Sequence, residues 1–151
     1  MSMCFPYRQR RTRQPVVSLG GRSVRPRPIV SVTLIGPSGN YLEDSFLDTG
    51  ADDTVFPELA ATKLGIDLSS APTGEAVGVG ASPTPVRYAE VTLRLTDGHE
   101  FRQWKGWVGF TAVPLKQPLL GFAGCLQFFT ATFLGDQEEV ELTVNALYPG
   151  I

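Results

Sequence analysis

Ten consecutive residues decide how this chain folds: Phe46-Leu47-Asp48-Thr49-Gly50-Ala51-Asp52-Asp53-Thr54-Val55. Apolar residues on both sides of the acidic turn predict a buried loop between two strands. Gly50 permits a tight turn and the close approach of another backbone, and Thr49 supplies a hydroxyl group for a buried hydrogen bond. Asp48, the first carboxylate of the turn, is therefore the candidate for acid–base chemistry.

The rest of the composition leaves few other routes to hydrolysis. The two cysteines, Cys4 and Cys125, are too few for a disulfide scaffold. Together with the one histidine they are also too few for a common structural zinc site. A Ser-His-Asp or Cys-His enzyme would have to use His99 as its base, in a charged, turn-like stretch. Two carboxylates that share a proton offer another route, because one can activate water while the other protonates the carbonyl oxygen. This chemistry needs no metal ion and no other cofactor, and none is expected.

Residues 47–55 resemble the active-site motif of the retropepsin-like aspartic proteases, a family that includes the retroviral proteases. The similarity covers about residues 28–145. It implies an all-β chain, a retropepsin-like closed β-barrel with one or two short helices. It also implies that Asp48 is catalytic. The other site residues of this segment are those of the active-site loop, Thr49 and Gly50, and those that would border the substrate, Ala51, Asp52 and Asp53.

Two later segments fall where this family needs them. Residues 77–81 resemble the glycine-bearing flap that closes over substrate, with substrate-binding positions at Val77, Gly78, Val79 and Gly80. Residues 119–121 resemble the apolar strand that threads behind the active-site loop. Viral members of the family commonly carry arginine directly after Gly121, where this chain has Phe122. Asp52, the usual partner of that arginine, is therefore expected either to be solvated or to meet an arginine from another segment.

The chain has one Asp-Thr-Gly sequence, which is half of a two-carboxylate site. The resemblance therefore implies a homodimer with its twofold axis between two copies of Asp48, and with Thr49 reaching the partner loop. We predict a homodimeric aspartic endopeptidase that hydrolyses peptides or proteins. Two other hypotheses stay open, a retropepsin-fold dimerisation or peptide-binding module with little turnover and a nucleic-acid-binding protein. Nucleic acid is not the expected partner.

Charge divides the chain into two parts. Residues 1–27 hold seven arginines and no acidic residue, whereas the remaining residues hold six basic and fifteen acidic side chains, a net charge of −9. The arginine- and proline-rich arm at 1–27 is predicted to be disordered, ahead of one folded domain at 28–151. No apolar stretch reaches the roughly 18 residues of a membrane span, and the arm lacks the apolar core of a secretory signal. A cytoplasmic protein is expected.

Alternating apolar residues, together with glycine and proline, predict strands joined by turns. Strands are expected at 29–35, 41–47 and 54–56, a helix at 57–65, long hairpins from 73 to 108 that turn at 78–85 and 96–98, a short helix within 122–129, and a last hairpin of 130–133 with 140–144. Trp104 and Trp107 lie three apart and should point to opposite faces of a strand.

Overall fold

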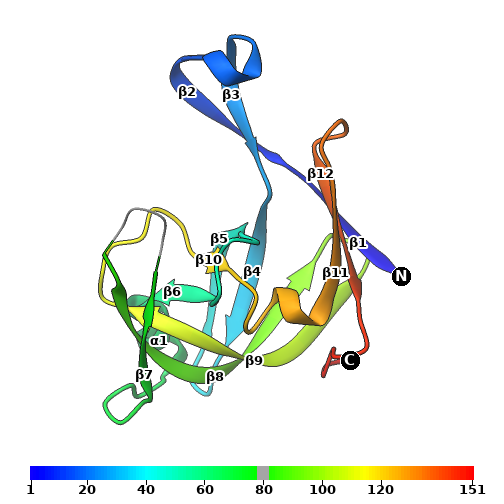
Figure 1. Ribbon diagram of the computed structural model, residues 1–151. Helices are drawn as coiled ribbons and strands as arrows, with labels where there is room; N and C mark the ends of the chain where they lie inside the picture. The colour runs from blue at the N-terminus through cyan, green and yellow to red at the C-terminus, as the bar shows by residue number, and fades with distance from the viewer. Residues whose placement is uncertain (78–81) are drawn as a thin grey trace.

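The computed structural model describes residues 1–77 and 82–151 and consists mainly of strands (Figure 1). In these ranges the elements are β1 (Ser2–Pro6), β2 (Arg8–Val16), η1 (Val17–Leu19), β3 (Arg22–Arg27), β4 (Ile29–Ile35), β5 (Asn40–Leu47), β6 (Val55–Pro57), α1 (Glu58–Leu64), β7 (Thr73–Ala76), β8 (Thr84–Thr96), β9 (Phe101–Thr111), β10 (Leu119–Leu120), η2 (Leu126–Phe128), β11 (Phe129–Leu134) and β12 (Glu139–Val144). The prediction of an all-β chain with short helices is confirmed. The short helix expected within 122–129 is one 3-10 turn, η2.

The main sheet contains seven of the described strands, in the order β4-β5-β10-β6-β9-β8-β7. β4 also pairs with β8, so the sheet closes on itself through this pairing and β7 lies beyond it. Apolar side chains alternate along the strands, and the largest of those fully buried in this sheet are Trp104, Phe56, Phe110, Ile29 and Leu34. The closed sheet gives the loops at its ends a rigid base.

The helix α1 lies where the sequence predicts it. Pro57 precedes its first turn, and Gly65 ends it with a φ of 76°, a left-handed conformation that favours glycine. Ala60, Ala61 and Leu64 point into the core. The helix therefore covers part of the main sheet without contributing to the loop around Asp48.

The prediction that residues 1–27 are disordered is wrong. β1 pairs with β12 in a three-stranded sheet β1-β12-β11, and Met3 and Phe5 are buried in the core. Composition misled the prediction, because two apolar side chains at alternate positions are enough to anchor a strand. The arginines follow in β2 and β3, which pair with each other as a hairpin that projects from the body of the molecule (Figure 1).

Asp97 ties this N-terminal strand to the turn between β8 and β9. Its carboxylate accepts hydrogen bonds from the backbone N–H groups of Cys4 (3.0 Å), His99 (2.9 Å) and Glu100 (2.8 Å). These bonds, that from Glu100 foremost, lower the pKa of Asp97 from 3.8 to about 2. The ionised carboxylate therefore stabilises the folded chain.

We expect Asp97→Asn to lower the melting temperature at pH 7 by about 3 °C, because a lost charge-assisted hydrogen bond near the surface costs about 1 kcal/mol. The folded-state pKa is depressed, so the contribution is complete above pH 3.8 and disappears as the pH falls through about 2. Urea unfolding of the wild type and of Asp97→Asn between pH 2 and pH 7 measures this contribution to the free energy of unfolding. Asp136→Asn, at an exposed position, is the control. A difference that stays constant down to pH 2 would contradict this role.

The two tryptophans point to opposite faces, as the sequence predicts, and Cys125 is a core residue. Trp104 is buried and donates a hydrogen bond from its indole nitrogen to the Gly124 carbonyl oxygen (2.8 Å), whereas Trp107 is 52% exposed. Cys125 is fully buried, and this burial raises the pKa of its thiol to about 12. Cys125 is therefore an unreactive core side chain. Over the described part of the chain, no helix has the length and apolar character needed to cross a membrane.

Candidate active site

Asp48 lies in the loop that directly follows β5. Its backbone N–H donates a hydrogen bond to the Leu120 carbonyl oxygen (3.1 Å), and the Ala51 N–H donates to the Asp48 carbonyl oxygen (3.2 Å). The Gly50 N–H donates to the Asp48 carboxylate (2.9 Å). These bonds hold the backbone and carboxylate of Asp48 in place at the start of the loop. Asp48 is partly buried, and Thr49 and Gly50 are exposed.

Residues 119–123 support this loop from behind, and the family resemblance at 119–121 implies this arrangement. β10 lies between β5 and β6, with Leu119 opposite both Phe46 and Val55. The Phe122 N–H then donates to the Ala51 carbonyl oxygen (2.9 Å), and the Ala123 N–H donates to that of Asp52 (2.8 Å). The loop is thus held by backbone bonds along most of its length.

Gly121 allows this close approach. A Cβ atom at position 121 would lie 2.7 Å from the Ala51 carbonyl oxygen and still closer to that of Asp53. Both are backbone atoms of the Asp48 loop, so any larger residue at position 121 must displace the loop itself. Thr54 adds a side-chain bond to the same segment, since its buried hydroxyl donates to the Ala123 carbonyl oxygen (2.8 Å).

Two open cavities meet at Asp48. One, of about 410 Å³, is lined by Asp48, Gly50, Ala51, Asp52, Asp53, Val55, Glu75, Ala76, Val77, Thr84, Leu115 and Leu119. The other, of about 540 Å³, is lined by Arg10, Arg27, Phe46, Asp48, Leu115, Lys116, Gln117 and Leu119. Asp48, Leu115 and Leu119 belong to both, so the two cavities adjoin at Asp48, and together they are called the Asp48 groove below.

The structure brings most of the predicted site residues to this groove. Asp48, Gly50, Ala51, Asp52, Asp53 and Val77 line one cavity. Thr49 is exposed in the same loop. The flap positions Gly78, Val79 and Gly80 lie outside the described residues. The described ends of that hairpin, β7 and β8, pair antiparallel and put Ala76 opposite Thr84.

Asp52 and Phe122 show how the chain departs from the family pattern. Asp52 is exposed, and among the described residues it makes no ion pair within 4.0 Å. Asp52 was expected either to be solvated or to meet an arginine, and in the single chain its side chain is solvated. Phe122 is 60% exposed although it follows the buried β10. An apolar side chain thus lies at the surface directly beside the active-site loop.

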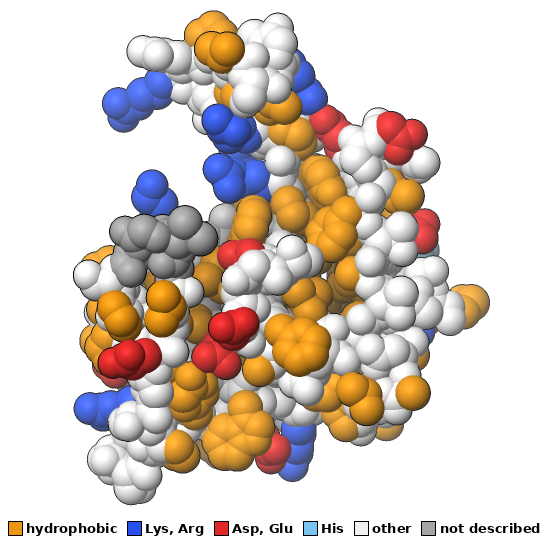
Figure 2. Space-filling view, viewed as in Figure 1, with side chains coloured by type: hydrophobic (Ala, Val, Ile, Leu, Met, Phe, Trp, Pro, Cys, Tyr) orange, Lys and Arg blue, Asp and Glu red, His pale blue; other side chains and the backbone are white. Residues whose placement is uncertain are grey.

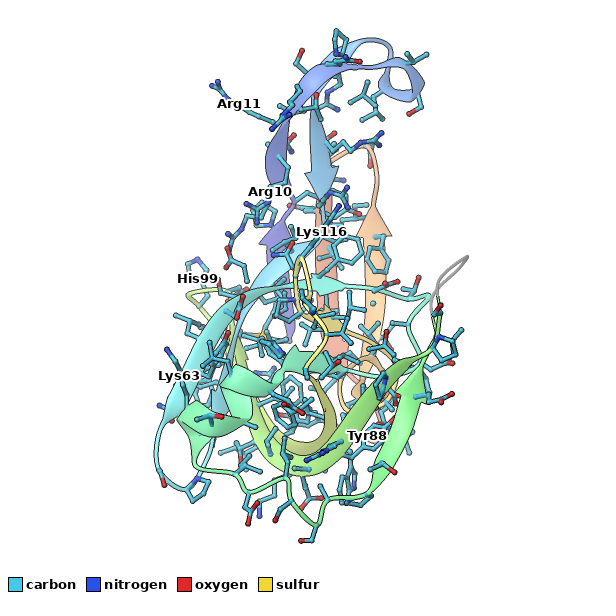
Figure 3. All side chains as sticks on the ribbon, turned by 90° about the vertical axis from the view of Figure 1, so that its left-hand side faces the viewer. Arg10, Arg11, Lys63, Tyr88, His99 and Lys116 are labelled. Atoms are coloured by element: carbon cyan, nitrogen blue, oxygen red, sulfur yellow. The ribbon has the colours of Figure 1, made fainter. Side chains whose placement is uncertain are left out.

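Tyr88 is a site residue that the sequence analysis missed. Its hydroxyl donates a 2.8 Å hydrogen bond to the Asp53 carboxylate. Its ring packs against Gly74 and Gly109, where a Cβ atom would lie 2.7 Å and 3.3 Å, respectively, from the nearest ring atom. Burial, together with the bond to Asp53, raises the pKa of Tyr88 to about 12, so the phenol stays a donor. Tyr88, labelled in Figure 3, therefore connects the flap hairpin to the active-site loop.

A group of possible metal ligands, Cys4, Glu139 and Glu141, lies in the three-stranded sheet, away from the residues that line the Asp48 groove. Burial, with the hydrogen bond and charge of Glu139, raises the pKa of the Cys4 thiol above its usual value. Cys4 belongs to the arm at 1–27 that the sequence predicted to be disordered. The structure instead places it in β1, opposite Glu141.

Comparison with solved structures gives 29 matching chains. One is the crystal structure of a retropepsin-like aspartic protease from Rickettsia conorii, which matches with a TM-score of 0.51 and 20% sequence identity over 94% of this chain and 90% of that chain. No protein-family model and no curated protein sequence matches the chain. The likeness confirms the fold that the sequence predicts: this chain has the retropepsin-like fold of aspartic proteases.

Proposed function

We propose that the protein is a homodimeric aspartic endopeptidase in which two copies of Asp48 form one catalytic site. The observation that carries the proposal is the position of Asp48: on a loop braced by β10, with its carboxylate at an open groove. In this proposal, an extended peptide lies along the groove. Ala51, Asp52, Asp53 and Val77 line it and would border the substrate.

In the proposed reaction, the ionised Asp48 takes a proton from a water molecule, whose oxygen bonds to the scissile carbonyl carbon. The protonated Asp48 of the partner subunit gives its proton to the carbonyl oxygen, which yields a tetrahedral diol. The Asp48 that took the proton from water then gives it to the amide nitrogen, and the ionised Asp48 of the partner subunit takes a proton from a diol hydroxyl. The carbon–nitrogen bond breaks as the carbonyl re-forms, which returns the pair of carboxyl groups to its singly protonated state. The Gly50 N–H stabilises the ionised carboxylate through the 2.9 Å bond described above.

Two surface features support a dimer. Thr49 is exposed beside Asp48, where its hydroxyl could bond to the matching loop of a second chain. Phe122, 60% exposed and bonded through its N–H to Ala51, offers apolar surface that a second chain would cover. One chain carries one Asp-Thr-Gly loop, so the second chain also completes the chemistry.

A dilution series tests the proposal. We expect cleavage of casein or a peptide library, with a specific activity that falls as the protein is diluted through its dimer dissociation constant. The oligomeric state is measured in parallel by sedimentation. Undiminished activity of a monomer, or peptide binding without any cleavage by the dimer, would contradict the proposal.

A further inference from the structure

We infer that the basic side of the Asp48 groove selects peptides with an acidic side chain close to the scissile bond. This inference rests on the proposed function and adds a substrate class to it. The selecting residues are Arg10, Arg27 and Lys116, which come from β2, the end of β3 and the loop before β10.

The projecting hairpin places its arginines over the groove. Arg10 and Arg27 line the same 540 Å³ cavity as Asp48, and Lys116 lines it from the 112–118 loop. Figure 2 shows Lys and Arg side chains gathered around the hollow beneath the hairpin, and Figure 3 labels Arg10 and Lys116 there. The cations and the proposed catalytic carboxylate therefore share one cavity.

None of the three cations is held in a close ion pair within the described residues. Asp44 is bonded to Arg8 at 3.1 Å and to the Ser31 hydroxyl at 2.6 Å, whereas Arg10 approaches it only to 4.0 Å. Within the described ranges, Arg27 and Lys116 make no ion pair within 4.0 Å.

The Arg27 guanidinium lies over the Phe46 ring, 5.8 Å from its centroid, a contact that holds it at the cavity without neutralising it. The positive charge of the cavity therefore lacks a full counter-charge.

A single carboxylate fits this cavity better than a nucleic acid does. Phe46, Leu115 and Leu119 also line the cavity and would contact the apolar part of a glutamate side chain. The other cavity at Asp48 carries Asp52, Asp53 and Glu75, and would repel an extended polyanion. Carboxylates bind arginine through paired, charge-assisted hydrogen bonds. We therefore expect a preference for glutamate or aspartate in a peptide.

The test uses matched peptides around one cleaved sequence, with glutamate, glutamine or lysine placed in turn at each position flanking the scissile bond. At the preferred position, the glutamate peptide should exceed its glutamine counterpart in kcat/KM by about fivefold, the upper range for a partly exposed ion pair. The ratio should fall towards one at high salt, since exposed charges are screened.

Arg10→Gln combined with Lys116→Gln should lower that ratio at least twofold, because two of the three selecting cations are removed. The matched control is Arg11→Gln with Lys63→Gln, which removes the same charge from the neighbouring position of β2 and from α1. Neither Arg11 nor Lys63 lines the cavity, so the control protein should keep the preference. A wild-type ratio near one, or equal loss in both double variants, overturns the inference while cleavage itself upholds the proposed function.

A binding assay decides the inference if no peptide is cleaved. The same peptides, fluorescently labelled, are titrated with wild-type protein, and tighter binding of the glutamate peptide that depends on Arg10 and Lys116 supports the inference. Equal binding of the glutamate and glutamine peptides overturns it. Displacement of the glutamate peptide by a short single-stranded oligonucleotide, with the same dependence on Arg10 and Lys116, would also overturn it in favour of nucleic acid.

Discussion

Asp48→Asn is expected to lower peptide cleavage by at least about a thousandfold, because an amide can neither take a proton from water nor pass one on. The fold should survive. The asparagine has nearly the same shape, and its side-chain oxygen can still accept the 2.9 Å bond from the Gly50 N–H. Peptide cleavage and thermal unfolding are measured on the same purified dimer.

The control for this variant is Asp136→Asn, which makes the same chemical change in an exposed turn. Asp136→Asn should keep both activity and stability. Cleavage by Asp48→Asn at a rate comparable with the wild type would show that Asp48 is not catalytic. A large loss of stability in Asp48→Asn would instead assign the residue a structural role.

Gly121→Ala is expected to destabilise the protein by about 2 kcal/mol or more, because overpacking against fixed backbone costs about 1–3 kcal/mol. The added Cβ would meet the carbonyl oxygens of Ala51 and Asp53, which belong to the active-site loop. The melting temperature should therefore fall by about 4–8 °C. Activity should fall as well, since the displaced loop carries Asp48.

Gly135→Ala is the matched control, because a Cβ at Gly135 meets nothing within 4 Å. This variant should unfold close to the wild-type temperature. Equal stability of the two alanine variants would mean that β10 does not press against the loop.

The strands that carry the site could be predicted from the sequence because apolar and polar side chains alternate along them. The apolar pattern of β4, the turn at Gly98 and the helix ending at Gly65 are local signals that tertiary contacts reinforce. The active-site loop was readable for a different reason, since its acidic turn, glycine and apolar flanks occur together within residues 46–55. Gly121 was placed behind the loop by resemblance, and its backbone contacts explain why glycine is needed there.

The parts that could not be predicted depend on contacts between distant segments. Composition alone indicated that the arm is disordered. β1 is ordered because it pairs with β12 and because the Cys4 N–H donates a hydrogen bond to Asp97, 93 residues away in the sequence. With the arm taken as disordered, Arg10 and Arg27 could not be placed at the groove. Lys116 had a usable signal, because its loop directly precedes residues 119–121.

Mixed dimers test most directly the claim that two copies of Asp48 make one site. Wild-type chains and Asp48→Asn chains are unfolded together at varied ratios, refolded and assayed for peptide cleavage at a fixed total concentration. If both carboxylates are required, activity follows the square of the wild-type fraction, so an equal mixture keeps about one quarter of the activity. Activity that falls in direct proportion to the wild-type fraction, with one half remaining in the equal mixture, would contradict a shared site.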